Sequence, residues 1–136
     1  MSRKRAREEF FKLLFEADVK DESLVVVAAD FVTREEFDLG DEDKKFIKGY
    51  AENMENFSQE IENVLENNLK GWSLNRIGVV ERVILKFAAY ELLKEKEVGF
   101  QIVVNEAIEL AKKYGDVKSY EFINGVLANI IKNSDK

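Results

Sequence analysis

The sequence has 136 residues, a length typical of one domain that can bury a core without disulfides or bound metal. It contains no cysteine and no histidine, which removes the thiolate nucleophile, the cysteine-held zinc site and the usual acid–base group near neutral pH. The formal net charge is −6, but residues 1–12 carry five basic side chains against two acidic ones. The acidity is concentrated in residues 13–70, so the net charge does not exclude a nucleic-acid partner.

The sequence carries no sign of secretion or catalysis. No apolar signal segment follows the basic N-terminus, and no apolar run approaches the roughly 18 residues needed to cross a membrane. No glycine-rich phosphate loop, nucleophile motif or metal-ligand spacing is present, and glutamates at helical spacing such as Glu106 and Glu109 are interpreted as an exposed face. We therefore expect a cytoplasmic protein that is not an enzyme and has no cofactor, no metal site and no membrane partner.

Helical periodicity begins near the N-terminus. Apolar residues at spacings of three and four predict a first helix over residues 3–17, with Ser2 as its N-cap. Asp21 is expected to cap a second helix over residues 22–34. Its β-prone run, residues 24–29, is interpreted as helical because a lone strand would have no partner.

The next helical stretch is predicted to begin at Gly40 and to continue to Gly71, with a kink or division at residues 56–58. The Gly-Trp-Ser sequence that starts at Gly71 is expected to separate two helical halves. These halves cover about residues 1–70 and about residues 71–136.

The second half contains the most apolar stretch. Ser73 or Asn75 is expected to start a helix that is apolar almost all round from Val79 to Leu93, which predicts the most buried helix of this half. Val98 and Gly99 then form a turn.

A further helix is predicted from Phe100 to a C-cap at Tyr114 and Gly115. Ser119 is the expected cap of a last helix, whose periodicity runs through the turn-like pair Asn124-Gly125. The side chains expected on the core face of the first of these two helices are Ile102, Val103, Ala107, Leu110 and Ala111. The pattern as a whole predicts an all-α protein.

The sharpest charge feature is the basic run Arg3–Arg7. Such a run on a helix can contact phosphates, although a soluble tail explains it equally well. Phe11, Phe15 and Phe122 could stack on unpaired bases, but each is individually better explained as a core residue. Lysines at 112, 113 and 118 would extend a positive patch if they lay near the first helix.

Several motifs together resemble the bacterial transcription antitermination factor NusB family. The resemblance covers nearly the whole chain and is strongest from Trp72 to Leu127. The motifs that carry it are Arg3–Arg7, Trp72–Arg76, Val80–Lys86, Tyr90–Leu92, Asn105–Gly115 and Phe122–Leu127.

The resemblance implies a compact NusB-like all-α domain of about seven helices in two halves, spanning residues 1–136. It also implies binding to boxA RNA of nascent ribosomal RNA transcripts, together with the ribosomal protein NusE, in a complex with RNA polymerase. Glu81 is the candidate contact with NusE. The positions that the resemblance assigns to RNA binding are Arg3, Lys4, Arg5, Arg7, Phe15, Lys118, Ser119 and Phe122.

One departure and two alternatives accompany this resemblance. The family usually has proline where this chain has Gly99, so the turn before the next helix is expected to differ. A similar helical domain occurs at the N-terminus of ribosomal RNA cytosine methyltransferases, and such an enzyme would continue beyond Lys136. A purely structural, self-associating protein, for instance a homodimer, is the second alternative.

Overall fold

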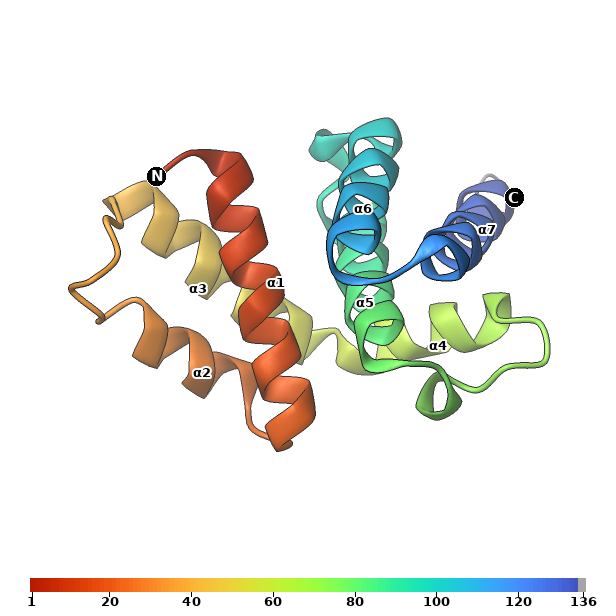
Figure 1. Ribbon diagram of the computed structural model, residues 1–136, viewed down its shortest axis with the longest axis horizontal. Coiled ribbons are helices and arrows are strands. Elements are labelled where there is room, and N and C mark those ends of the chain that lie inside the picture. The colour runs from red at the N-terminus through yellow and green to blue at the C-terminus, as the bar shows by residue number, and fades with distance from the viewer. Residues whose placement is uncertain (135–136) are drawn as a thin grey trace. The chain divides into compact units, whose positions relative to one another are not determined.

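The computed structural model describes residues 1–134, and every regular element in this range is a helix, as predicted. The N-terminal unit, Met1–Phe57, contains three helices, and the C-terminal unit begins at Ser58 (Figure 1). The helices of the N-terminal unit are α1 (Arg3–Lys20), α2 (Leu24–Phe31) and α3 (Asp41–Asn56). The elements of the C-terminal unit are α4 (Ser58–Asn68), η1 (Leu74–Arg76), α5 (Val79–Lys94), η2 (Lys96–Val98), α6 (Phe100–Tyr114) and α7 (Val117–Ser134).

The core of the N-terminal unit is aromatic. The ring of Phe10 on α1 is fully buried and meets two rings of α3 edge-on, at centroid distances of 6.1 Å for Phe46 and 5.7 Å for Tyr50. Edge-to-face pairs contribute about 0.5–1.5 kcal/mol each beyond the burial of their area. This cluster therefore fixes α1 against α3.

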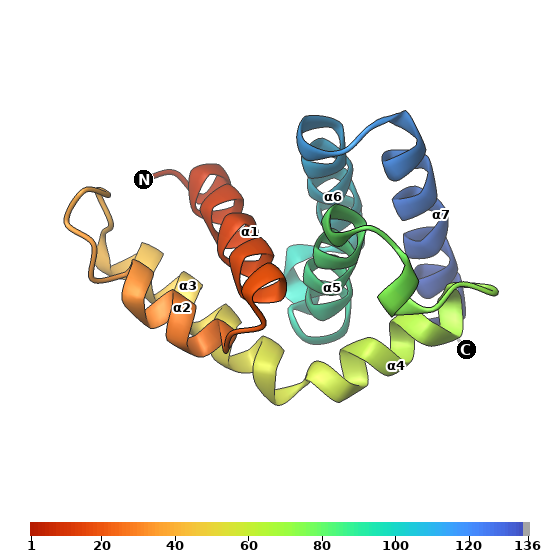
Figure 2. The same cartoon turned by 60° about the horizontal axis from the view of Figure 1, so that its bottom comes forward.

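In the C-terminal unit, α5 is the central helix, because α4, α6 and α7 all pack against it. Its side chains from Val83 to Glu91 are buried with the exception of Lys86. Because α5 is apolar on almost every face, it can be removed from water only if other helices surround it. This is the burial that the sequence predicts. In Figure 2, α6 and α7 run side by side and are joined by a short connection.

The predicted cap of the first helix is confirmed, and that of the second is wrong. Ser2 caps α1 as predicted, since its hydroxyl accepts a hydrogen bond from the Arg5 N–H at 3.1 Å. Asp21, however, ends α1 in the left-handed conformation with φ +54°, and Ser23 caps α2 instead. Both residues suit an N-cap, and the one that follows the tight turn takes the role.

The two units meet in sequence at Phe57 and Ser58, within the predicted division at residues 56–58. The division near residue 70 is not observed, because α4 packs against α5 and α7 and so belongs to the C-terminal unit. Ser73 begins the short η1 turn, and α5 starts later, at Val79. The assignment of residues 1–136 to a single domain stays a prediction.

The α6 helix spans the predicted residues, but its first turn is less buried than expected. Ile102 is 55% exposed, whereas Val103, Ala107 and Ala111 are buried. Gly99, which precedes this helix, has φ +84° and donates its N–H to the Lys96 carbonyl at 3.2 Å. Neither feature is open to proline, whose ring fixes φ near −65° and which has no N–H.

Gly99→Pro should therefore destabilise this chain although the family resemblance favours proline at this position. We expect the free energy of unfolding to fall by more than about 1 kcal/mol, measured by urea denaturation. Gly99→Ala keeps the N–H and should cost less. A proline variant as stable as the parent would show that the turn does not need its positive φ.

Two glycines, Gly115 at the end of α6 and Gly125 within α7, should respond oppositely to alanine. A Cβ at Gly115 would lie 2.8 Å from the Ser119 Cβ, whereas a Cβ at Gly125 would meet no atom within 4 Å. We expect Gly125→Ala to stabilise the protein by up to about 1 kcal/mol, because glycine is a poor helix former. Gly115→Ala should cost about 1–3 kcal/mol by overpacking. Urea unfolding of both variants tests this, and equal effects would contradict it.

Candidate nucleic-acid interface

The basic run predicted from sequence forms the first turns of α1. We call Arg3, Lys4, Arg5 and Arg7 the basic turn; Arg7 is partly buried and the other three are exposed. No acidic residue lies in the first turn of α1. Positive charge at a helix N-terminus opposes the macrodipole, so this placement costs a few tenths of a kcal/mol or more unless an anion is bound nearby.

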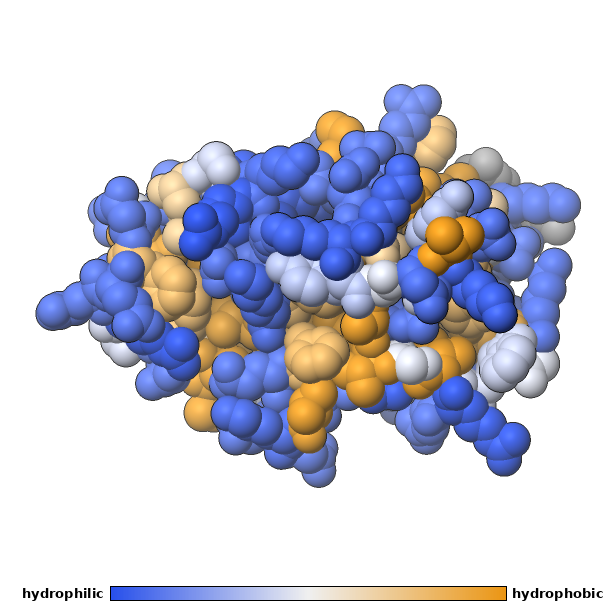
Figure 3. Space-filling view, viewed as in Figure 1, coloured by the Kyte–Doolittle hydropathy of each residue, from blue (hydrophilic) through white to orange (hydrophobic). Residues whose placement is uncertain are grey.

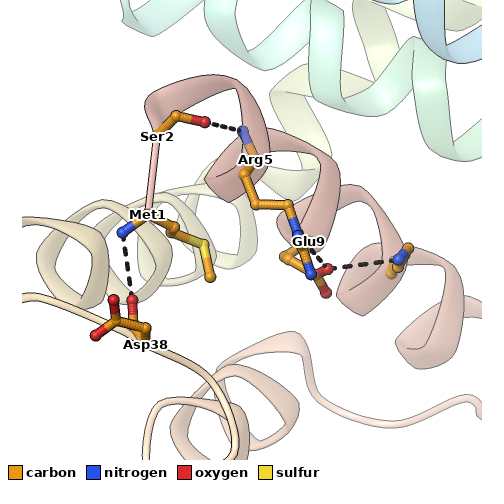
Figure 4. A network of polar contacts seen from close by, with 6 residues as sticks. Met1, Ser2, Arg5, Glu9 and Asp38 are labelled. Carbon is orange, nitrogen blue, oxygen red and sulfur yellow. Dashed lines mark hydrogen bonds and ion pairs between the residues drawn. The ribbon is translucent and has the colours of Figure 1, made fainter.

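Two arginines of the basic turn are held in place by neighbouring side chains. The Arg3 guanidinium lies 4.3 Å from the centroid of the Phe46 ring, and Arg5 Nε donates to Glu9 Oε1 at 3.1 Å. Figure 4 shows Arg5 folded along the helix toward Glu9, whose carboxylate also faces Lys12 Nζ at 3.4 Å. Glu9 is only 5% exposed, so it forms a fixed anchor for both cations.

Phe15 lies three helical turns after Lys4, on the same side of α1. Its side chain is 37% exposed, and its ring centroid is 6.4 Å from that of the buried Phe11. The prediction that Phe11 is core is therefore confirmed, while Phe15 presents part of an aromatic ring to solvent. An exposed ring supported by a buried ring is a suitable platform for a base.

The second predicted set lies where α6 passes into α7, a segment that we call the joint (residues 115–122). Gly115 closes α6 by donating its N–H to the Ala111 carbonyl at 2.8 Å. Asp116, not Ser119, caps α7: Asp116 Oδ1 accepts from the Ser119 N–H at 2.9 Å. This bond from the Ser119 N–H, and then the bond from its hydroxyl, hold the pKa of Asp116 below its usual range.

Sequence reasoning missed Asp116, although an aspartate directly before the first apolar residue of a helix, here Val117, is a recognisable capping signal.

Within the joint the predicted residues differ in exposure. Lys118 is exposed and Phe122 is half-buried, whereas Ser119 is only 7% exposed. The Lys112 ammonium lies 5.7 Å from the centroid of the Tyr120 ring, so α6 adds a further cation next to the joint. The joint therefore presents a cation and part of an aromatic side chain, while the Ser119 side chain is buried.

Glu81, the candidate partner contact, lies in the first turn of α5. Its carboxylate contacts the joint, because Glu81 Oε1 accepts from Ser119 Oγ at 3.3 Å. It also lies close to the helix start, and a Cβ on Gly78 would be 3.0 Å from Glu81 Oε1. Two of the predicted site residues, assigned from sequence to different partners, are thus bonded to each other.

The predicted residues fall into one set in each unit. The basic turn and Phe15 share α1 in the N-terminal unit, and the joint and Glu81 share the C-terminal unit. Figure 3 is coloured by hydropathy and shows mostly hydrophilic side chains in that view, with hydrophobic side chains among them. Among residues 1–134, no helix has the length and apolarity needed to cross a membrane, and no cluster of three acidic side chains is placed to hold a metal ion.

Comparisons with known proteins match nearly the whole chain. The NusB family model matches residues 4–132. The transcription antitermination protein NusB of Clostridium botulinum is 38% identical over 132 residues, which cover 97% of this chain and 99% of that protein.

Solved structures agree with this match. The structure of T. maritima NusB is 35% identical and superposes with a TM-score of 0.86, covering 97% of this chain and 92% of that one. A chain in the crystal structure of the antitermination factors NusB and NusE in complex with dsRNA is 28% identical, with a TM-score of 0.84, and the match covers 98% of this chain and 99% of that chain. From the family model, the sequence identity and the shared fold, we conclude that this chain belongs to the NusB family.

Proposed function

We propose that this chain is a non-catalytic, cytoplasmic RNA-binding factor that binds boxA RNA of nascent ribosomal RNA transcripts together with NusE and so supports antitermination by RNA polymerase. The observation that carries this proposal is its end-to-end similarity to NusB antitermination proteins. The similarity extends to a chain solved in complex with NusE and dsRNA. These relatives are NusB proteins matched over 99% of their own lengths, which favours the antitermination function over that of a methyltransferase.

The basic turn supplies the phosphate contacts in this proposal. Each lysine or arginine that neutralises a phosphate releases condensed counterions, so binding gains free energy and becomes sensitive to salt. Because Phe46 and Glu9 already restrain Arg3 and Arg5, these side chains lose less conformational freedom on binding than freely rotating ones would. Their order in the unbound protein therefore supports a role in RNA binding.

Aromatic side chains supply the contacts to bases. Phe15 on α1 and Phe122 in the joint each expose part of a ring, and stacking on such a ring is how single-stranded RNA is commonly held. Lys118 lies one turn before Phe122 and would contact the neighbouring phosphate. Ser119 belongs to the proposed site by holding the joint, and Glu81 is the proposed contact with NusE.

Removing charge from the basic turn should weaken RNA binding specifically. We propose Lys4→Ala with Arg5→Ala, which changes two exposed residues, and a control in which the exposed Lys44 and Lys45 on α3 become alanine. Each lost phosphate contact should reduce affinity roughly five-fold at 0.1 M salt and lower the salt slope by about 0.7. Fluorescence anisotropy with boxA RNA and a scrambled RNA, with and without NusE, measures both quantities.

The two double variants remove the same charge from the same unit. Comparing them therefore separates the loss of direct RNA contacts from the effect of net charge on RNA affinity. Equal losses in both would overturn the assignment of the basic turn. A wild-type protein that does not prefer boxA over the scrambled RNA in either condition would overturn the proposed function.

Phe15→Ala should remove a stacking contact of about 1–3 kcal/mol, which lowers RNA affinity without changing the salt slope. Phe100→Ala is the matched control, since Phe100 is also exposed, at 54% against 37% for Phe15, and lies on α6 away from the joint. Isothermal titration with boxA RNA gives the two affinities. A Phe15 variant that binds as tightly as the control would show that this ring does not hold a base.

A further inference from the structure

We propose that Glu81 is a positioning residue for RNA binding: through Ser119 it ties the joint to α5 and so fixes where Lys118 and Phe122 meet the RNA. This inference rests on the proposed function, but it gives Glu81 a role that needs no NusE. Glu81 and Ser119 are 38 residues apart in sequence, and their side chains join the first turn of α5 to the first turn of α7.

The Ser119 end of this contact is buried and closely packed. Ser119 is 7% exposed, so its hydroxyl is largely shielded from water that could replace Glu81. A Cβ at Gly115 would clash with Ser119 at 2.8 Å, and a Cβ at Gly78 would lie 3.0 Å from the Glu81 carboxylate. The Ser119 end of the hydrogen bond is therefore closely packed against Gly115, and the Glu81 carboxylate lies next to Gly78 at the start of α5.

Asp116 cannot replace Glu81 in this role. Asp116 Oδ1 accepts from the Ser119 N–H at 2.9 Å, which starts α7 but joins only neighbouring residues of the joint. The Ser119 hydroxyl has a single proton, and its oxygen lies 3.1 Å from Asp116 Oδ1 and 3.3 Å from Glu81 Oε1. The hydroxyl proton is therefore shared between the two carboxylates, and of these two contacts the one with Glu81 is the one that reaches α5. The contact with Glu81 therefore ties the joint to α5 in addition to the apolar packing.

The residues proposed to meet RNA lie on either side of this anchor. Lys118 precedes Ser119, and Phe122 follows it by three residues, which places Lys118 and Phe122 four apart on neighbouring helical positions. A shift of Ser119 would move both side chains together. Loss of Glu81 should therefore weaken a phosphate contact and a stacking contact at the same time.

Whether RNA affinity rises or falls when Glu81 is replaced distinguishes a positioning role from a simple effect of charge. Removing a carboxylate makes the protein less negative and, by charge alone, should tighten RNA binding. Loss of positioning should weaken it instead. Glu81→Ala removes both the charge and the hydrogen-bond acceptor, whereas Glu81→Gln removes the charge but keeps an acceptor oxygen. The control is Glu121→Ala, which removes an exposed carboxylate beside Phe122 that does not bond to Ser119.

The test is anisotropy titration of boxA RNA without NusE over a range of salt concentrations. We expect Glu81→Ala to bind RNA at least about five-fold more weakly, which is the smallest loss of affinity expected when one stacking contact is lost. Its salt slope should fall by about 0.7, one phosphate contact. Glu81→Gln should recover most of the affinity, and Glu121→Ala should bind as tightly as the wild type or more tightly.

Ser119→Ala provides a second route to the same answer, because it removes the hydroxyl with little change in volume. It should weaken binding as Glu81→Ala does, and the double variant should be no worse than either single one. Binding by Glu81→Ala or Ser119→Ala that equals that of Glu121→Ala would overturn the inference while leaving the proposed function intact. Absence of RNA binding by the wild type would instead overturn the proposed function.

Discussion

Burial of α5 on nearly all sides is the constraint on which the C-terminal unit depends. Side chains such as Leu85 and Phe87 each contribute about 1.5–3 kcal/mol when they are removed from water, but only if α4, α6 and α7 are all in place. These helices therefore stabilise one another through α5. The joint between α6 and α7 is held by this packing. Its polar contact with the first turn of α5 is directional, unlike apolar packing, and so favours one position of the joint against α5.

The sequence predicted best those elements whose signal is repeated over many residues. The all-round apolar pattern between Val79 and Leu93 identified α5 as the central helix, and the long periodicity through Gly125 correctly outweighed a turn-like dipeptide. Predictions that rested on one polar residue were weaker. Where two residues could each cap a helix, as with Asp21 and Ser23, the choice depends on the backbone path between the helices, which local composition does not encode.

Long-range features could not be predicted in the same way. Gly71 marks a local change in chain direction, whereas the division between the units depends on which helices α4 packs against. The bond between Glu81 and Ser119 joins residues that were assigned to different partners, because only the folded chain brings the starts of α5 and α7 together. Ile102 fits the helical period of the apolar residues, which predicts burial. It is exposed because it lies in the first turn of α6, at the end of the helix.

The turn at Gly99 limits which substitutions the chain can accept during evolution. A glycine at φ +84° and the proline expected from the family require different backbone paths, so proline cannot replace Gly99 while the rest of the turn stays fixed. The effect of that substitution therefore depends on its sequence background, which is epistasis in a short segment. Consensus design, which imports the commonest residue at each position, would need to transplant the whole turn, residues 95–99, as one block.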